Sequence, residues 1–407
     1  MHPAAADSDE SDADGWRRTT SILSVGQLIT WGILYYSFAV YMPQMRDDLG
    51  WSLASLTGGF AVAVLVSGMA SPLVGRRIDR VGSRTLMSLG AVTGTVGLVL
   101  WAIAQTLTVY YIAFTIIGLA MSATLYPPAF ATVVRHYPGK SRSAIVAITL
   151  VAGLASTIFS PLAQVLAHQW DWRTGLLILA AGFAVTIIPL NLALPQDESS
   201  SAPTQHAQRS EPNRAGDAQP ANFWLLAVVF TLAAGTAVAF NVHIIAFLLD
   251  KGLDATLAAS IAGAAGISKV GGRVIIAAGT RYSATALLRT SLMIQAAFFA
   301  MPVVWDHTAS SVIMVLMFGA TSGALTVLRP VLIAELFGSE VFGSKNGQVQ
   351  LITTLAQAAA PVAAGLLVTA STYKTTWLCL AVIVAAASLL TVRLANEPRH
   401  QGTAAAD

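Results

Sequence analysis

The chain has 407 residues, of which 55% are hydrophobic and only 11% are charged. Ordinary soluble domains carry about 25% charged residues, so this chain lacks the charges that a water-exposed surface of its size requires. The net charge of +3 is small, so the positions of the charges along the chain matter more than their sum. The composition therefore excludes a soluble globular domain and predicts a protein whose solvent is the lipid bilayer.

Motifs that carry enzyme chemistry are missing from the sequence. There is no phosphate loop, no HExxH, no nucleophile elbow and no nucleic-acid-binding module. The single cysteine, Cys379, excludes a disulfide framework and zinc sites built from paired cysteines. We therefore expect neither an enzyme nor a nucleic-acid partner, and no metal or cofactor.

The chain begins with a polar segment, 1–18, that is rich in Ala, Asp and Ser. Its composition predicts disorder. Five acidic residues precede its first arginines, whereas a secretory signal begins with basic residues and an early apolar run. We therefore expect the first hydrophobic stretch to remain in the protein as a membrane anchor.

Twelve stretches are long and apolar enough to cross a membrane, for which about 20 residues are needed. They cover 20–44, 53–75, 84–104, 107–134, 143–167, 173–194, 222–249, 255–279, 285–304, 309–336, 346–370 and 374–395. The eighth and the tenth contain charges and are identified from their length and flanks. The sequence therefore predicts an all-α membrane protein of twelve transmembrane helices.

One long connection, 195–221, divides these stretches six and six, and its Pro, Ser, Gln and charged residues are typical of a flexible linker. Prolines recur in the two halves at offsets of 202 and 200 residues, Pro128 with Pro330 and Pro161 with Pro361. Such internal repeats are common in membrane transporters. The predicted parts are a tail at 1–18, a six-helix bundle at 19–194, the linker 195–221, a second six-helix bundle at 222–395 and a tail at 396–407.

The positions of Lys and Arg predict the orientation, because these residues are retained on the cytoplasmic side. With the N-terminus inside, the cytoplasmic segments hold 16 of the 23 and the outer loops hold 4. The remaining three lie within spans: Lys269, Arg273 and Arg329. We expect a monomer in the cell membrane with both termini in the cytoplasm.

The loop between the second and third spans, 75–84, reads Gly-Arg-Arg-Ile-Asp-Arg-Val-Gly-Ser-Arg. A glycine lets helices approach closely, an aspartate can cap a helix N-terminus, and a second glycine permits a tight turn. The loop resembles the Gly-x-x-x-Asp-Arg-x-Gly-x-Arg signature of the major facilitator superfamily. The matching residues are Gly75, Asp79, Arg80, Gly82 and Arg84. The resemblance implies two six-helix bundles, alternating access and a conformational role for this motif; the alternative is a basic loop that only follows the orientation rule.

The corresponding loop of the second half, 276–281, keeps an arginine but lacks the glycine and has Thr280 in place of the aspartate. We therefore expect the motif to act mainly from the first half.

Three patches resemble the monocarboxylate transporter and oxalate–formate antiporter group of that superfamily. They are Trp31–Phe38 followed by Leu49–Ser52, the basic segment 135–144, and Gly272-Arg273. The resemblance implies that Arg273 binds the substrate carboxylate and that Tyr126 contacts the substrate. The fifth span reads Phe-Ser-Pro-Leu-Ala over 159–163 and lacks the Gly-Pro-x-x-Gly-Gly ending of drug antiporters, which argues against drug–proton antiport without excluding it.

The charges within spans are candidates for the substrate site, because an ionisable group in the bilayer is costly and tends to face a cavity. Lys269 and Arg273 lie one helical turn apart with no acidic residue near them in that span, which indicates an anion receptor. Arginine can hold a carboxylate through two parallel hydrogen bonds. The alternative for Arg273 is a structural pair or a side chain extending to the cytoplasmic face. Lys269 departs from the group, whose members have an aspartate or a neutral polar residue there, and this leaves proton coupling in doubt.

Other polar residues within spans complete the candidate set. Arg329 either lines the path or pairs with Glu335. Tyr36 and Asn241 are candidates for substrate contacts, as is Tyr126, for which packing between helices is the alternative. His243 is a candidate proton carrier because the ordinary pKa of histidine is near neutrality, although such a residue more often bonds a neighbouring helix.

These observations predict a secondary active transporter of a small organic anion, a monocarboxylate, which works by alternating access with possible proton coupling. One alternative is an exporter of drugs or a secondary metabolite. A third possibility, a receptor that keeps the fold without transport, would be favoured by an extended soluble domain.

Overall fold

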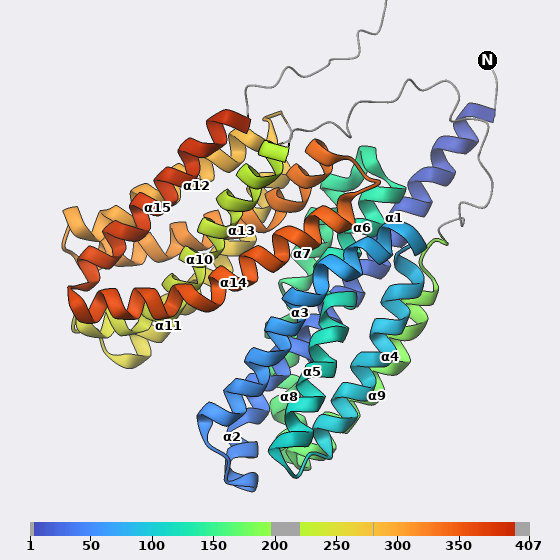
Figure 1. Ribbon diagram of the computed structural model, residues 1–407, viewed down its shortest axis with the longest axis horizontal. Helices are drawn as coiled ribbons and strands as arrows, with labels where there is room; N and C mark the ends of the chain where they lie inside the picture. Colours follow the sequence, from blue (N-terminus) through green and yellow to red (C-terminus); the bar gives the residue numbers. More distant parts are fainter. Residues whose placement is uncertain (1–3, 197–219, 280, 395–407) are drawn as a thin grey trace, which may run out of the picture. The chain divides into compact units, whose positions relative to one another are not determined.

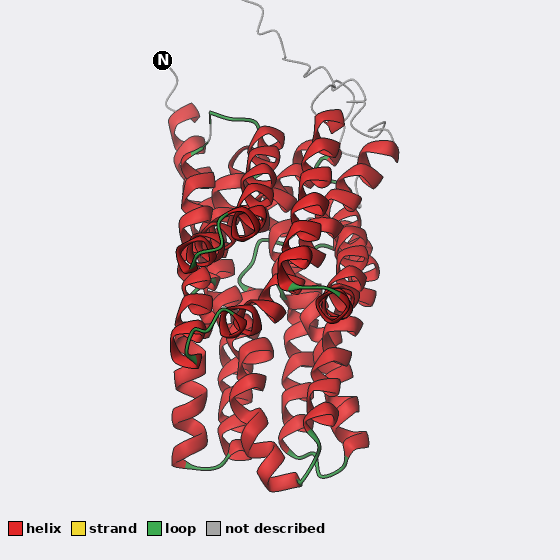
Figure 2. Cartoon of the chain, turned by 90° about the vertical axis from the view of Figure 1, so that its left-hand side faces the viewer, coloured by secondary structure: helices red, strands yellow, loops and turns green. Residues whose placement is uncertain are grey.

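The computed structural model describes residues 4–196, 220–279 and 281–394. Within these ranges the chain is helical and contains no strand, as Figure 1 and Figure 2 show. The helices, including the π-helix η1 and the 3-10 helix η2, are α1 (Ala4–Trp31), η1 (Gly32–Tyr36), α2 (Ser37–Leu49), α3 (Leu53–Val81), α4 (Ser83–Ala102), α5 (Leu107–Thr124), α6 (Tyr126–His136), η2 (Pro138–Lys140), α7 (Ser141–Ala152), α8 (Ala155–Gln169), α9 (Trp172–Leu192), α10 (Pro220–Asp250), α11 (Ala255–Ala278), α12 (Ala284–Val304), α13 (Thr308–Phe337), α14 (Phe342–Ala370) and α15 (Tyr373–Leu394).

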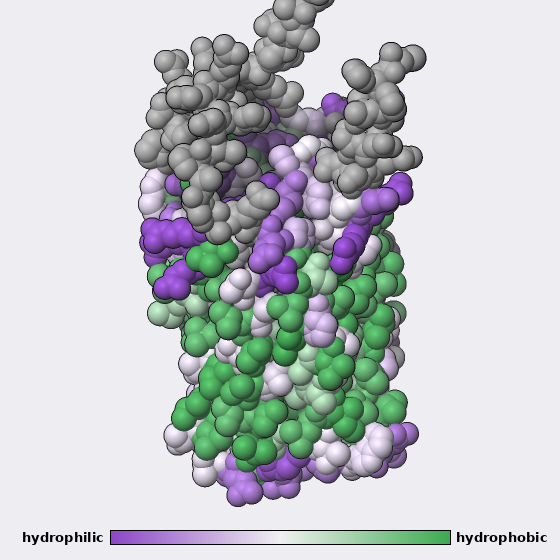
Figure 3. Space-filling model, turned by 90° about the vertical axis from the view of Figure 1, so that its right-hand side faces the viewer, coloured by the Kyte–Doolittle hydropathy of each residue, from purple (hydrophilic) through white to green (hydrophobic). Residues whose placement is uncertain are grey.

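Twelve helical segments of the described chain are long and apolar enough to span a membrane. Each overlaps one of the twelve predicted ranges, and every end agrees to within six residues. Figure 3 shows a face on which apolar side chains form a broad band between polar residues at both ends. The prediction of an all-α membrane protein with twelve transmembrane helices is confirmed.

The predicted disorder of the first segment differs from the structure. Helix α1 begins at Ala4, so residues 4–18 are helical and continue into the first span. Alanine has the highest helix propensity, and acidic residues near a helix N-terminus interact favourably with the helix dipole. The same composition that suggested disorder therefore also supports a helix. Most of the predicted linker, and the predicted tail 396–407, lie outside the described residues.

The junction between the first two spans shows how local sequence sets helix ends. Helix α2 ends at Leu49, and the next residue, Gly50, adopts a left-handed conformation with φ of 63° that glycine accepts without strain. Helix α3 then begins after Ser52, whose side chain accepts a hydrogen bond from the backbone N–H of Ser55. The Gly-Trp-Ser sequence thus ends one helix and caps the next.

The described residues fall into two compact units. Unit 1 contains those within 1–218 together with 273–277 and 329–355, and unit 2 contains those within 219–272, 278–328 and 356–407. The division passes through α11, α13 and α14. Parts of three second-half helices therefore belong to the same unit as the first half of the chain.

Each unit has its own aromatic core. In unit 1, Phe38 stacks on Phe60 with ring centroids 4.7 Å apart, and Trp101 lies 4.9 Å from Phe114. Helices α3, α4, α5 and α9 surround this core and lie side by side (Figure 1). In unit 2, Phe240 stacks on Phe318 at 3.9 Å, and α15 packs against both α10 and α12. Large rings bury much apolar area and supply most of such packing energy.

Candidate functional site

Arg273 is a buried cation whose hydrogen-bonding capacity is only partly used. It lies on α11, and 9% of its surface is exposed. Its Nη1 donates a hydrogen bond to the carbonyl oxygen of Thr149 over 2.6 Å. Its Nε is buried without a hydrogen-bond partner, and no carboxylate among the described residues forms an ion pair with it. Because a guanidinium stays protonated in proteins, the charge at this position is uncompensated within the described chain.

The partner of Arg273 lies at a break in the fifth span. Helix α7 ends at Ala152 and α8 begins at Ala155. A Cβ atom on Gly153 would lie 2.5 Å from the Nη1 of Arg273, so any other residue there would require the guanidinium to shift. The carbonyl of Thr149 accepts bonds from both the Arg273 side chain and the Gly153 amide. The interrupted helix thus provides the acceptor and the space that Arg273 occupies.

The fourth span is also broken, and Tyr126 begins its second part. Helix α5 ends at Thr124, and Leu125 is extended before α6 starts. Pro127 and Pro128 lack the N–H groups that would continue the helix. The carbonyl of Thr124 instead accepts a 2.6 Å bond from the buried Nε2 of Gln27 on α1. The two successive prolines therefore place Tyr126 at the start of a helix. The carbonyl of Thr124 binds Gln27 of α1 instead of an amide of its own span.

The first span contains a third irregularity, the π-helix η1 from Gly32 to Tyr36. Single turns of π-helix occur frequently at functional sites. A Cβ atom on Gly32 would overlap the ring of Phe159, so η1 and α8 are in close contact. The π-helix ends at Tyr36, one of the candidate substrate residues.

The structure brings Tyr36 and Tyr126 close enough to Arg273 for each to interact with it electrostatically. Trp31 completes this group, since its ring centroid lies 5.1 Å from that of Tyr126 and 6.4 Å from that of Tyr36. Tyr126 also stacks on Phe130 at 5.1 Å, so the predicted packing role is present beside the proposed polar one. The result is an aromatic cluster of Trp31, Tyr36 and Tyr126 whose two tyrosines interact with the charge of Arg273.

Arg329 belongs to a separate polar chain in unit 1. Its Nη2 donates a 2.7 Å hydrogen bond to the Oε1 of Gln350 on α14, and Gln350 donates to the Oγ1 of Thr354. A neutral amide satisfies one donor of the guanidinium but not its charge. Its pairing with Glu335 and its position on the substrate path both stay predictions.

The remaining candidates lie in unit 2. Lys269 is on α11, where its backbone is so close to α13 that a Cβ atom on Gly323 would overlap the Lys269 carbonyl. Asn241 is exposed, and its Nδ2 donates to the Ala237 carbonyl of its own helix. The Nε2 of His243 lies 3.0 Å from the carbonyl oxygen of Pro361. A carbonyl only accepts, so this ring nitrogen carries the proton in that contact.

The loop motif of the first half contacts the start of α14. Asp79, in the last turn of α3, accepts hydrogen bonds from the backbone N–H groups of Gly343 (2.9 Å) and Ser344 (2.7 Å). These are first-turn amides, which no helical carbonyl can satisfy, and a carboxylate there interacts favourably with the helix dipole. The predicted capping chemistry of Asp79 is thus observed, with a helix 264 residues away in sequence.

Glycines allow α3 and α14 to approach this closely. A Cβ atom on Gly75 would overlap the carbonyl of Gly343, and one on Gly347 would overlap the carbonyl of Ser71. Small residues at a helix–helix contact in a membrane permit such backbone approach. Gly75 of the motif is therefore a condition for the bonds that Asp79 makes.

The turn after α3 completes the motif. Gly82 has φ of 85°, a conformation that favours glycine, and it separates α3 from α4. The carbonyls of Ile78 and Asp79 at the end of α3 accept bonds from the Nη1 of Arg135. Arg84 lies in the first turn of α4, and Arg80 lines an open cavity beside α3.

Sequence reasoning missed several residues that the structure places in these clusters: Thr149, Gly153, Gln350, Gly343 and Ser344. Only the glycines offered a sequence signal, because a glycine within a span permits a break or a close approach. A backbone carbonyl and a backbone amide are present at every position and carry no sequence signal. Among the described residues, no group of three or more His, Cys, Asp or Glu is placed to hold a metal ion.

Comparison with known proteins assigns the family. The Major Facilitator Superfamily matches residues 23–318, more than half of the chain. Monocarboxylate transporter 13 of Rattus norvegicus is 26% identical over 346 residues, covering 82% of this chain and 77% of the relative. The multidrug resistance protein MdtL of Klebsiella pneumoniae is 27% identical over 226 residues, covering 53% and 55%.

The fold has a counterpart among solved structures. The crystal structure of the human organic anion transporter MFSD10 superposes with a TM-score of 0.72 at 14% identity, covering 92% of this chain and 99% of that one. At this identity the likeness is evidence for the fold alone. The chain is a multi-pass membrane protein, and it belongs to the Major Facilitator Superfamily, whose members transport small molecules.

Proposed function

We propose that the protein is a secondary active transporter of a small organic anion, a monocarboxylate, and that Arg273 binds the carboxylate. The observation that carries the proposal is the buried guanidinium of Arg273, whose charge and Nε have no partner among the described residues. A buried charge without a counterion is strongly unfavourable, so an anion that reaches it gains much of its binding energy there. The monocarboxylate transporter relative, at 26% identity, supports the same substrate class.

The phenol groups of Tyr36 and Tyr126 would complete the binding of the carboxylate. Both tyrosines interact with the charge of Arg273, and a hydroxyl can donate to a carboxylate oxygen. Lys269, one turn before Arg273 on α11, would add positive potential. Asn241 and Arg329 would make further substrate contacts, because both are polar residues within membrane spans.

Transport would proceed by alternating access, with the Asp79 contact as a latch that opens and closes. Its two bonds to the first turn of α14 are short, involve a charged acceptor and join segments far apart in sequence. The strong positive bias of one set of loops supports placing this latch, and both termini, on the cytoplasmic side of the cell membrane. We propose a monomer as the working unit.

Coupling to protons would involve His243. Its Nε2 donates to the Pro361 carbonyl, and histidine is the residue type whose ordinary pKa lies near neutrality. No other residue of the candidate set has an ordinary pKa near neutrality. The alternative coupling is exchange of one anion for another, which the positive charge of Lys269 would favour.

A second candidate function is export of drugs or a secondary metabolite. It is favoured by the match to the multidrug resistance protein, which extends over about half of this chain. In that case the aromatic group around Arg273, formed by Trp31, Tyr36 and Tyr126, would bind the ring system of an amphipathic compound.

The test is a flux measurement in proteoliposomes that contain the purified full chain and carry an imposed pH gradient. A panel of labelled short-chain monocarboxylates is compared with a lipophilic cationic dye. We expect saturable carboxylate flux that is lost in Arg273→Gln and unaffected by the dye. Dye flux without carboxylate flux would overturn the proposal in favour of drug export, and no flux of either would favour a receptor.

A further inference from the structure

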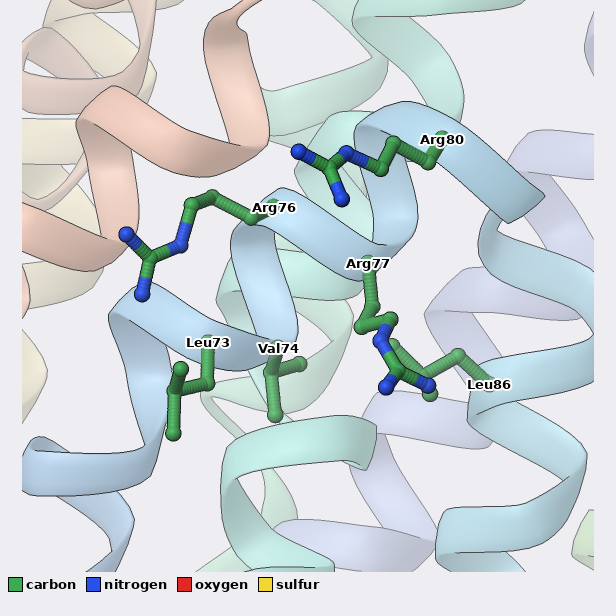
Figure 4. A pocket seen from close by; sticks show the side chains of 6 residues that line it. All are labelled: Leu73, Val74, Arg76, Arg77, Arg80 and Leu86. Atoms are coloured by element: carbon green, nitrogen blue, oxygen red, sulfur yellow. The ribbon is translucent and has the colours of Figure 1, made fainter.

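Three arginines of α3 line an open cavity, and none of them takes part in the Asp79 contact with α14. The cavity has a volume of about 420 Å³, and its walls are formed by Leu73, Val74, Arg76, Arg77, Arg80 and Leu86. In Figure 4, Arg76 and Arg80 extend to the same side of α3, while Arg77 extends toward Leu86. All these residues belong to unit 1 and to the ends of α3 and α4.

The three guanidinium groups have no polar partner in the described chain. All three residues are exposed, and none forms a hydrogen bond or an ion pair with another described residue. Other arginines of unit 1 differ. Arg135 binds two carbonyls at the end of α3, and Arg173 binds two carbonyls and Asp48. Three like charges within two helical turns repel one another, so a counter-anion would stabilise them.

The rest of the cavity wall is apolar and continues onto an exposed apolar surface. Leu73 and Leu89 are 60% and 58% exposed, and Met69, one turn earlier on α3, is 64% exposed. Exposed apolar residues on a membrane-spanning helix contact acyl chains. The cavity thus has cationic groups at one end and an acyl-facing surface at the other, which is the order of groups in a phospholipid.

We propose that this cavity binds an anionic phospholipid, with the phosphate on Arg76, Arg77 and Arg80 and an acyl chain along Leu73 and Met69. Arginine suits the phosphate, because its planar donors can bind two phosphate oxygens at once. Basic pockets at the ends of membrane helices attract anionic headgroups. A soluble phosphate compound would use the same arginines but would gain nothing from the apolar wall, which is why we assign the site to a lipid.

The test is a titration of the purified full chain in detergent with phosphatidylglycerol and, separately, with phosphatidylcholine. Bound lipid is counted by native mass spectrometry, and the midpoint of thermal unfolding is followed in parallel. The double variant Arg76→Gln/Arg77→Gln is compared with Arg281→Gln/Arg393→Gln, which removes the same two charges from exposed residues outside the cavity. We expect the first pair to lower the apparent affinity for phosphatidylglycerol about tenfold or more and the second to change it less than twofold.

Three results would overturn the proposal. They are equal binding of the two lipids by the wild type, equal losses in the two double variants, and stabilisation by soluble glycerol phosphate as strong as that by the lipid. If Arg76→Gln/Arg77→Gln does not fold, Arg76→Lys/Arg77→Lys keeps the charge and loses the two-oxygen contact. That variant should bind phosphatidylglycerol severalfold more weakly than the wild type, and unchanged affinity would also overturn the proposal.

Discussion

The first half of the chain interrupts three of its membrane helices, whereas the described membrane spans of the second half are each a single continuous helix. The first span contains the π-helix η1, the fourth is divided into α5 and α6, and the fifth into α7 and α8. By contrast, α13 runs through Pro330 and α14 through Pro361 without interruption. Of the two pairs of prolines at matching offsets, Pro161 and Pro361 both lie inside helices, whereas Pro128 lies in the first turn of α6 and Pro330 lies inside α13.

The number of missing backbone donors explains part of the difference. Pro127 and Pro128 remove two successive N–H groups from the fourth span, while Pro330 stands alone in α13. One lost bond bends a helix, whereas two lost bonds at one place interrupt it more readily. Gly153 adds the break in the fifth span, where its lack of a side chain gives Arg273 its space.

The broken helices and the continuous helix α11 contribute different groups to the candidate site. The broken helices of the first half supply the carbonyl of Thr149, which accepts a bond from Arg273, and the phenol groups of Tyr36 and Tyr126. The continuous helix α11 supplies the cation, Arg273. Irregular backbone within a membrane is tolerated only where its polar groups find partners, and Arg273 and Gln27 are two such partners here.

The largest effect is expected from removing the cation of α11. Arg273→Gln should lower kcat/KM for a carboxylate roughly hundredfold, because it removes the charge that the site offers to the substrate. Protein abundance should stay near that of the wild type. Flux in proteoliposomes at matched protein density is the measurement.

Arg173→Gln is the matched control for that variant. Arg173 also donates to backbone carbonyls, those of Ala102 and Ala104, but it pairs with Asp48. Its loss should lower thermal stability and leave the KM of the surviving protein unchanged. The same pattern in Arg273→Gln would show that Arg273 is structural.

Asp79→Asn should lower turnover about tenfold with little effect on abundance. The asparagine would place an amide nitrogen against one of the N–H donors of Gly343 and Ser344, and it would lose the charge that favours a helix N-terminus. Ser344→Ala keeps the backbone donor and should transport like the wild type. Full activity of Asp79→Asn would remove the latch from the mechanism.

Gly153→Ala should raise KM about fivefold. Its Cβ would lie 2.5 Å from the Nη1 of Arg273, so the guanidinium must shift and weaken its bond to the Thr149 carbonyl. Gly365→Ala is the second-half control, because its Cβ would make an ordinary 3.5 Å contact with the ring of His243. Equal KM changes in the two variants would contradict a special role for the first-half break.

The smallest effect is expected from Tyr126→Phe, which removes one hydroxyl and keeps the ring packed on Phe130. KM should rise about threefold with unchanged stability, since one hydrogen bond contributes about 0.5–1.5 kcal/mol. Tyr110→Phe should show the reverse, because the Tyr110 hydroxyl donates a 2.6 Å bond to the Leu56 carbonyl within the core. Thermal unfolding and flux measured on the same preparations separate the two cases.

The membrane helices could be predicted from the sequence because hydrophobic length is a local property. The twelve long apolar segments and the loop motif around Asp79 could be identified without knowledge of any tertiary contact. The helical state of residues 4–18 was missed, because alanine and acidic residues are common in disordered segments and in helix starts alike.

The surroundings of Arg273 could be predicted only in part. A charged residue within a membrane span identified Arg273 as a candidate for substrate binding, and a family resemblance pointed to Tyr126. The role of the Thr149 carbonyl could not be predicted, because every residue has a carbonyl and the space that Arg273 occupies beside this one depends on the missing side chain of Gly153. The α14 amides that Asp79 binds could not be predicted either. The helix start that lies next to Asp79 is set by packing between segments that are 264 residues apart in sequence.

The central claim, that Arg273 recognises a carboxylate, is tested most directly by equilibrium binding. Calorimetry on purified wild type and Arg273→Lys would compare a monocarboxylate that the wild type transports with its uncharged amide. The wild type should prefer the carboxylate, and lysine, which offers a point charge in place of a planar fork, should weaken carboxylate binding by about 1.5–3 kcal/mol while leaving the amide unaffected. Equal carboxylate affinities in the two proteins, with both folded and equally abundant, would contradict the account.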